Sequence, residues 1–176
     1  MSHPKADDDA RQSFQRQINA YEKEDKPIVY IDESGFSKDM PRTHGYAPVG
    51  KRCYGTQDWN AKGRTNAIGA IIDNIFVALG LFESNVNADV FLSWTEQTLL
   101  PSLPKNCVIV MDNAAFHKRK DILDKIKKAG HILLFLPPYS PDLNPIEHKW
   151  AQAKKWRRKL QCSVDQLFQN ESIYVT

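Results

Sequence analysis

The stretch RTNAIGAIIDNIFVALGLF, residues 64–82, predicts a β-hairpin and sets the architecture of the chain. Two apolar segments, residues 64–72 and 75–82, are separated only by Asp73 and Asn74. A two-residue connection is typical of a tight hairpin turn, and Asp and Asn tolerate the positive φ angles that such a turn requires. We therefore expect two antiparallel strands in the middle of the chain.

Elements on both sides of the hairpin extend this prediction. Ahead of it, Pro27 separates a helix expected over residues 6–26 from a strand expected over residues 28–33, and residues 37–63 predict either a long functional loop or a poorly ordered excursion. The elements expected after the hairpin are a helix over residues 87–100, a strand over 107–112, a helix over 119–129, a strand over 131–136, a helix over 144–160 and the start of another over 163–169. An antiparallel opening followed by helix-linked parallel strands predicts an α/β fold, with a mixed sheet covered by helices.

Length and composition predict one soluble domain. A chain of 176 residues can bury roughly 70% of its unfolded surface in one core and is short for two domains. Its longest apolar runs fall short of a membrane span, and its N-terminus lacks the apolar core of a signal peptide, so an intracellular protein with no membrane partner is expected. Cys53, Cys107 and Cys162 lie far apart without a CxxC pair, which favours neither a disulfide framework nor a zinc site.

The net charge of +3 is unevenly distributed. Residues 116–160 contain 12 Lys and Arg residues but only 4 Asp and Glu residues, while the rest of the chain is net acidic. Such a basic block is typical of a surface that holds a polyanion through phosphate contacts. The alternative is a pair of solvated helices, which is a common explanation of charge runs.

Three carboxylates occupy positions where predicted elements begin or end. Asp32 and Asp112 close runs of β-branched residues, in IVYIDESGF and VIVMDNAAFH, and Glu147 lies in the first helical turn after the proline-rich segment LPPYSPDLNP. A charge at the end of a buried strand is costly without a counter-charge, and carboxylate oxygens are the ligands that Mg²⁺ prefers. If the strands of Asp32 and Asp112 are parallel neighbours, these acids predict a divalent-metal site.

Each acid also has a purely structural interpretation. Glu147 follows Asn144 by three residues, with a proline at the first helical position between them, which is a capping-box arrangement. Asp32 and Asp112 could end their strands through turn chemistry. His117 is open to three interpretations: a solvated residue at a helix start, a phosphate contact, or a group beside Asp112.

Four segments together favour the functional interpretation of the acids. They are YIDESGF (30–36), RTHGYAPVGKR (42–52), VIVMDNAAFH (108–117) and LPPYSPDLNPIEHKW (136–150). In this order they resemble the catalytic domain of mariner-like DDE transposases of bacterial insertion sequences, a branch of the Tc/mariner superfamily. The resemblance spans residues 28 to about 159, and the 34 residues between Asp112 and Glu147 match the spacing of the DD34E group.

The resemblance implies a ribonuclease-H-like fold in which Asp32, Asp112 and Glu147 are catalytic and bind two Mg²⁺ ions, for which Mn²⁺ can substitute. It implies an enzyme that cuts DNA at the terminal inverted repeats of its own element and joins the freed ends to target DNA, as a homodimer in the bacterial cytoplasm, at the nucleoid. Residues 28–176 are then the catalytic domain, and residues 1–27 are a helical arm or linker to DNA-recognition domains absent from this chain. The alternative is a catalytically inactive, nucleic-acid-binding remnant of a transposase.

The resemblance also suggests which residues approach DNA. Basic side chains can neutralise phosphates, and an aromatic ring in a polar loop can stack on a base. The residues expected to contact DNA are Arg42, Lys51, Arg52, Trp59, His117, Lys154, Lys155 and Arg158. The other tryptophans, Trp94, Trp150 and Trp156, have helical spacings that predict core positions.

Overall fold

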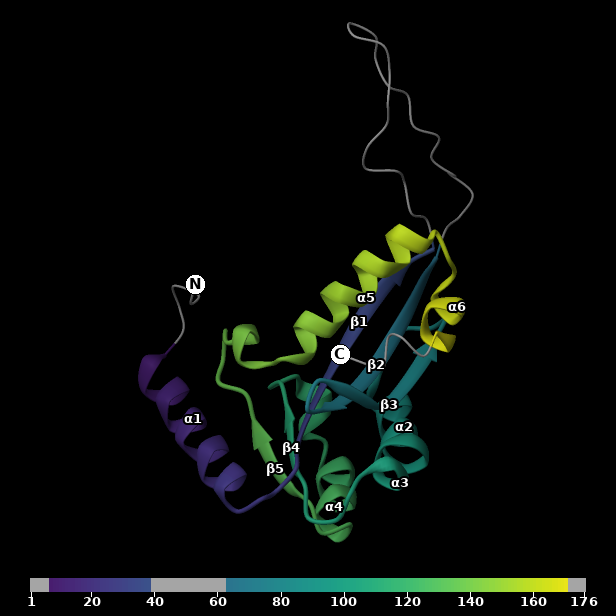
Figure 1. Ribbon diagram of the computed structural model, residues 1–176. Helices are drawn as coiled ribbons and strands as arrows, with labels where there is room; N and C mark the ends of the chain where they lie inside the picture. The colour runs from purple at the N-terminus through teal and green to yellow at the C-terminus, as the bar shows by residue number, and fades with distance from the viewer. Residues whose placement is uncertain (1–6, 39–62, 171–176) are drawn as a thin grey trace, which may run out of the picture.

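The computed structural model describes residues 7–38 and 63–170, which form one five-stranded sheet with flanking helices (Figure 1). The strands are β1 (Ile28–Ser37), β2 (Arg64–Ile72), β3 (Ile75–Phe82), β4 (Val108–Met111) and β5 (Ile132–Phe135). The helices are α1 (Asp8–Lys23), α2 (Ala88–Trp94), α3 (Leu100–Ser102), α4 (Lys120–Lys128), α5 (Ile146–Leu160) and α6 (Val164–Gln169). A π-helical turn, Thr95–Leu99, joins α2 to α3, and two 3-10 turns, Ala115–Lys118 and Pro141–Leu143, precede α4 and α5. Within the described ranges, no helix has the length and apolarity needed to cross a membrane.

The sheet has the strand order β3-β2-β1-β4-β5, with β1 at its centre. β1 pairs antiparallel with β2, and β2 with β3, whereas β1 with β4 and β4 with β5 are parallel pairs. The predicted mixed sheet is therefore confirmed, as is the parallel pairing of the strands that carry or lead to Asp32 and Asp112. Because parallel strands end at the same edge of a sheet, this topology brings the two acids toward one edge.

The predicted hairpin is confirmed, with both strands at the expected bounds. Asp73 and Asn74 form its turn with φ angles of 48° and 63°. β1 differs from its prediction because it continues to Ser37 instead of ending at residue 33. Its second half pairs with β2 as far as Ser37 opposite Arg64, so hydrogen bonding to the hairpin extends the strand past its apolar run.

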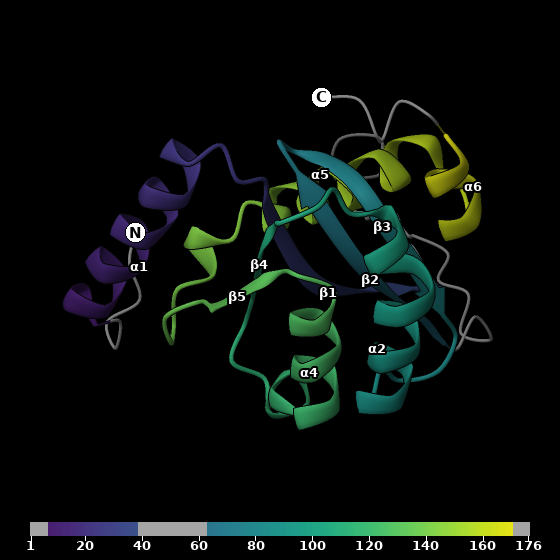
Figure 2. The same cartoon turned by 90° about the horizontal axis from the view of Figure 1, so that it is seen from below.

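Helices cover both faces of the sheet (Figure 2). Side chains alternate between the faces along a strand, and Val29 and Ile31 of β1 pack in the core under α2 and α4. On the other face, Trp150 of α5 packs on β2 directly over Gly69, where a Cβ atom would lie only 2.6 Å from Trp150 Cη2. The glycine therefore allows α5, which carries Glu147, to approach the sheet closely.

The N-terminal helix α1 packs against β1, β4 and the end of β5. Its buried residues Phe14 and Ile18 share a core cluster with residues of these strands. Arg11 makes two hydrogen bonds to the carboxylate of Asp142, at 2.9 and 2.6 Å, in the turn that precedes α5. The predicted N-terminal helix is thus observed, while the domain boundary at residue 27 stays a prediction.

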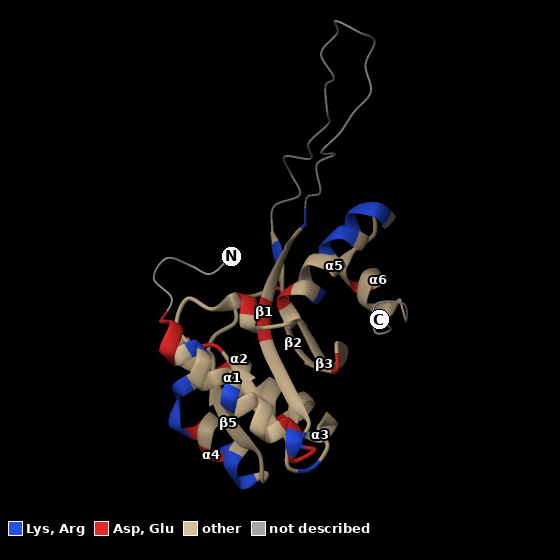
Figure 3. Cartoon of the chain, turned by 60° about the vertical axis from the view of Figure 1, so that its left-hand side comes forward, with Lys and Arg blue, Asp and Glu red and all other residues tan. Residues whose placement is uncertain are grey.

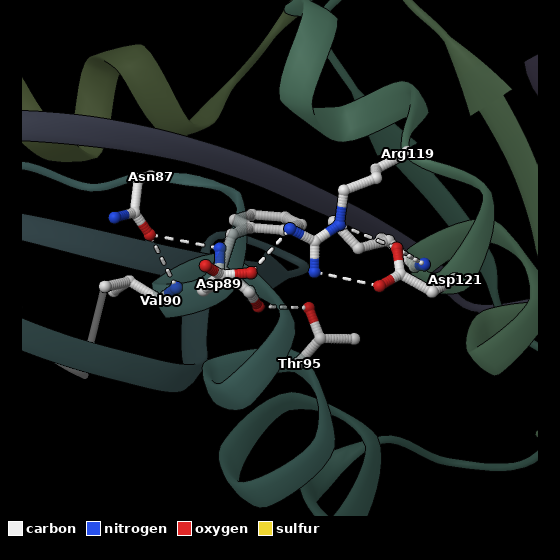
Figure 4. Close-up of polar contacts among 8 residues, drawn as sticks. Asn87, Asp89, Val90, Thr95, Arg119 and Asp121 are labelled. Atoms are coloured by element: carbon white, nitrogen blue, oxygen red, sulfur yellow. Dashed lines mark hydrogen bonds and ion pairs between the residues drawn. The ribbon is translucent and has the colours of Figure 1, made fainter.

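A polar network fixes α2 and α4 on the opposite face (Figure 4). Asn87 Oδ1 caps α2 by accepting hydrogen bonds from the backbone of Asp89 and of the next residue. Arg119, just before α4, donates to Asp89 at 2.6 Å and to Asp121 at 2.8 Å. The network therefore ties the starts of the two helices together beside the 3-10 turn that follows β4.

Candidate active site

A pocket of about 280 Å³ opens where β4 and β5 end. It is lined by Asp32 of β1, Asp112 just after β4, Glu147 in the first turn of α5, and the proline-rich loop, residues 136–144, which joins β5 to α5. Figure 3 shows acidic positions of β1 beside the acidic first turn of α5. The structure thus brings the three predicted acids to one pocket.

The three carboxylates share this pocket without forming a preassembled metal cluster. Among residues 7–38 and 63–170, no group of three His, Cys, Asp or Glu side chains is arranged to hold one metal ion. Like charges repel at short range, and Glu147 is exposed at the start of α5. Joint binding of an ion by these acids therefore stays a prediction.

Asp32 has the most perturbed carboxyl group of the pocket. Burial, followed by the negative charges of Glu147, Glu33 and Asp112, raises its pKa from 3.8 to about 7. A hydrogen bond with the backbone of Glu33 opposes the shift only in part. Because both main causes disfavour negative charge, this position would be stabilised by a nearby cation.

Asp112 has the opposite electrostatic environment. Its Oδ1 accepts a hydrogen bond from His117 Nδ1 at 2.7 Å and another from the Ala114 backbone at 2.8 Å. The hydrogen bond from His117 lowers the pKa of Asp112 below its ordinary value, against the effect of burial. The bond to Ala114 confirms the turn chemistry expected here, and the same carboxylate also lines the pocket.

His117 is completely buried, with 0% of its surface exposed. Its ring packs against Phe91 and Phe116, with centroids 4.5 and 4.2 Å away, and its Nε2 contacts Glu33 Oε1 at 2.9 Å. Burial would lower the pKa of His117, but the hydrogen bonds to Asp112 and Glu33 outweigh it and raise the pKa to about 9. Of the three interpretations of His117, the structure shows a group beside Asp112, and the DNA contact stays a prediction.

The capping-box interpretation of Glu147 is wrong. The residue before α5 is Pro145, and no side chain caps this helix. The Asn144 backbone N–H donates to Pro141, its side-chain Nδ2 lies 3.4 Å from the Ile31 carbonyl oxygen, and its buried Oδ1 has no hydrogen-bond partner among the described residues. Helix capping therefore does not account for Glu147 at this position.

Two residues that sequence reasoning missed shape the pocket wall. Asn113 Nδ2 donates to the carbonyl oxygen of Leu136, which ties the turn after β4 to the proline-rich loop. Tyr139 is 54% exposed and has a φ of 55°, which is unusual for an aromatic residue. Both lie inside the motifs that carried the resemblance, but only their spatial contact with the pocket distinguishes them from other loop residues.

The predicted DNA-contacting residues divide into two groups. Arg42, Lys51, Arg52 and Trp59 lie outside the residues that the structure describes. Lys155 and Arg158 are exposed on α5, while Lys154 is half-buried with its Nζ 5.6 Å from the centre of the Phe36 ring. The predicted core positions of Trp94 and Trp150 are confirmed, since both are nearly inaccessible, and Trp156 is half-buried.

Sequence comparison relates most of the chain to a known family. Residues 27–167 match the model of the DDE superfamily endonucleases. The uncharacterized protein y4pE/y4sA of Sinorhizobium fredii (strain NBRC 101917 / NGR234) is 41% identical over 46 residues, which cover 26% of this chain and 31% of that protein.

Solved structures of Mos1 transposase have a similar fold. The Mos1 transposase paired-end complex with the left transposon end matches with a TM-score of 0.69 and 19% identity, covering 84% of this chain and 47% of that one. The catalytic domain of Mos1 mariner transposase matches with a TM-score of 0.63 and 14% identity, covering 90% and 74%. This chain thus spans about half the length of the first of these chains, and the ribonuclease-H-like fold expected from the sequence is confirmed. Because the family model matches most of its length, the chain belongs to the DDE superfamily of endonucleases.

Proposed function

We propose that this chain is the catalytic part of a DNA transposase, which hydrolyses phosphodiester bonds at the ends of its own element and transfers the freed strands to target DNA. Membership of the DDE endonuclease superfamily supports the hydrolytic chemistry. The observation that carries the proposal is the convergence of Asp32, Asp112 and Glu147 on one pocket from three separate parts of the chain. These residues are the proposed catalytic acids.

The acids would hold divalent metal ions, with Mg²⁺ as the cofactor and Mn²⁺ as its substitute. Carboxylate oxygens suit both ions, and the raised pKa of Asp32, about 7, reflects a concentration of negative charge that a cation would offset. Mos1 paired-end complexes have been solved with Mn and with Mg. When bound, two such ions would activate the attacking oxygen and stabilise the leaving oxygen of the phosphodiester.

The chain's own groups would prepare the pocket for this reaction. Asp112 is held ionised, because the hydrogen bond from His117 lowers its pKa. The proline-rich loop forms a stiff wall beside Asp32, since proline fixes the backbone angle φ. Glu147 lies on a helix that Trp150 anchors to β2, so it can turn toward the pocket from a fixed backbone.

DNA is the proposed partner, first as the terminal inverted repeats of the element and then as the target. Mos1 transposase has been solved in complex with its left transposon end. On this chain, Lys155 and Arg158 are exposed phosphate contacts on α5, with Lys154 beside them. The proposal includes a homodimer on DNA in the bacterial cytoplasm, residues 28–176 as the catalytic domain and residues 1–27 as an arm toward DNA-recognition domains.

The proposal is tested by removing one acid at a time. Asp32→Asn and Asp112→Asn should each abolish nicking of labelled element-end duplex in Mg²⁺ or Mn²⁺, while the protein stays folded and binds DNA. Asp124→Asn, on the exposed surface of α4, is the matched control and should keep the wild-type activity. Full activity of either site variant would remove that residue from the proposed set. DNA binding without any nicking by the wild-type protein would favour the alternative, an inactive remnant.

A further inference from the structure

We propose that Glu33 and His117 form a positioning bridge that holds Asp112 in register with Asp32 for phosphodiester cleavage. This inference rests on the proposed function, because Asp32 and Asp112 are its catalytic acids. Neither Glu33 nor His117 lines the pocket. Both would therefore act through Asp112 and not on the substrate.

The bridge lies where the backbone no longer holds the two strands together. The parallel ladder between β1 and β4 ends with the pair of Tyr30 and Val110. Asp32 and Asp112 each lie two residues beyond that pair, at the level where β1 continues beside β2 only. Side chains must therefore set the relative position of the two acids, and the link from Glu33 through His117 to Asp112 spans this gap.

The adjacent β1 residues Asp32 and Glu33 thus have different roles. Side chains alternate along a strand, so Asp32 faces the pocket while Glu33 faces the side covered by α2 and the turn after β4. On that side the His117 ring is held between Phe91 and Phe116 and is completely buried. A ring packed in this way has little rotational freedom, so it fixes both carboxylates that it contacts.

The hydrogen bonds also distinguish the two carboxylate oxygens of Asp112. His117 Nδ1 and the Ala114 backbone both bond Oδ1, at 2.7 and 2.8 Å. A carboxylate oxygen has two acceptor sites, and these two contacts take up both sites of Oδ1. Oδ1 is thereby occupied, so Oδ2 is the oxygen that we expect to bind an ion.

The test uses Glu33, which can be changed without altering the pocket wall. Glu33→Ala removes the anchor of His117, and Glu33→Gln keeps an oxygen that can accept from Nε2. Groups that orient a metal ligand typically change metal affinity by about 10-fold or more when removed. We expect Glu33→Ala to weaken Mn²⁺ binding about 10-fold by calorimetric titration and to lower kcat with an unchanged KM for DNA. Glu33→Gln should recover most of both losses.

Glu83→Ala is the matched control, because Glu83 is exposed and pairs only loosely with Lys38 at 3.4 Å. Thermal melting identifies any variant that fails to fold. A folded Glu33→Ala protein with wild-type Mn²⁺ affinity and kcat would overturn the bridge, as would equal losses in Glu33→Ala and Glu33→Gln. If the wild-type protein binds Mn²⁺ but does not cleave DNA, the result counts against the proposed function alone. If it does not bind Mn²⁺, the proposed function and the positioning bridge are both wrong.

Discussion

Asp32 and Glu33 show how two neighbouring carboxylates acquire different chemistry from their surroundings. Burial and nearby negative charge raise the pKa of Asp32 to about 7, whereas Glu33 lies against the buried ring of His117. A carboxylate whose charged form is disfavoured in the folded state costs stability at neutral pH. The charged environment that would favour a bound cation at Asp32 therefore lowers the stability of the folded protein when no cation is bound.

This cost makes a prediction about Asp32→Asn. Because the folded-state pKa of Asp32 is raised from 3.8 to about 7, the stability contributed by its protonated form is complete below pH 4 and is lost as the pH rises to 7. In metal-free buffer at pH 8, Asp32→Asn should therefore be more stable than the wild type by up to about 4 kcal/mol, since each pKa unit corresponds to about 1.4 kcal/mol. Urea unfolding at pH 4 and pH 8 measures the difference, which should disappear at pH 4. A less stable variant at pH 8 would contradict the prediction.

Divalent cations should reverse this order of stability. Mn²⁺ that binds the folded state raises its stability in proportion to the logarithm of the free concentration above Kd. We expect millimolar Mn²⁺ to raise the melting temperature of the wild type and to leave that of Asp32→Asn almost unchanged. Removal of the ion with a chelator should make Asp32→Asn the more stable protein again. Asp124→Asn serves again as control and should respond like the wild type. An equal response of all three proteins would place the bound ion elsewhere.

At the scale of elements, the sequence predicted the helices and strands that depend on a local pattern of residues. The hairpin was predicted with correct bounds because Asp73 and Asn74 specify the turn and apolar segments flank it. The π-helical turn Thr95–Leu99 inside the helix predicted over residues 87–100 was missed, since apolar periodicity does not distinguish one extra residue in a turn. The burial of His117 was missed because its partner Glu33 is 84 residues away in sequence.

The same limit applies to α1 and to the candidate site. The three acids could be predicted from motif spacing, but the sequence contained no local signal that Arg11 of α1 bonds Asp142 in the turn before Glu147. This contact joins the N-terminal helix to the proline-rich loop that lines the pocket. The helix interpreted as an arm therefore also braces the segment that leads to the third acid.

Arg11→Ala tests this bracing role. The Asp142 side chain is 43% exposed, and ion pairs near the surface contribute little to stability, so the melting temperature should fall only slightly. The cleavage rate should fall by about 10-fold, because small displacements of a catalytic group have large effects on rate. Arg16→Ala, which removes an exposed arginine of the same helix, is the control and should retain wild-type activity. If both variants cleave equally well, α1 does not position the loop.

At the scale of the whole molecule, charge is separated between the pocket and the helices. Figure 3 shows acidic positions gathered where β1 meets α5, and basic positions along the far half of α5 and on α4. α4 and α5 cover opposite faces of the sheet, so a DNA duplex that reaches the pocket along α5 would not lie on α4 at the same time. The basic block of the sequence thus divides into two surfaces, and the proposed substrate path favours the one on α5.

We predict that this chain binds DNA weakly, with steep salt dependence and little sequence preference, mainly through α5. Phosphate contacts position a protein without reading sequence, and non-specific dissociation constants are typically about 10⁻⁴ to 10⁻⁶ M. Replacing Lys155 and Arg158 by Gln should weaken binding and reduce the slope of log K against log salt by about 0.9 for each phosphate that the protein no longer neutralises.

The control for this last experiment is the matched pair Lys127→Gln and Lys128→Gln on α4, which changes the net charge equally on the opposite face. Fluorescence anisotropy with element-end and scrambled duplexes at several salt concentrations measures both pairs. If the pairs weaken binding equally, net charge and not a defined path explains the affinity. Strong preference of these 176 residues for an element end would show that the described fold reads sequence, and the assignment of recognition to other domains would then have to be abandoned.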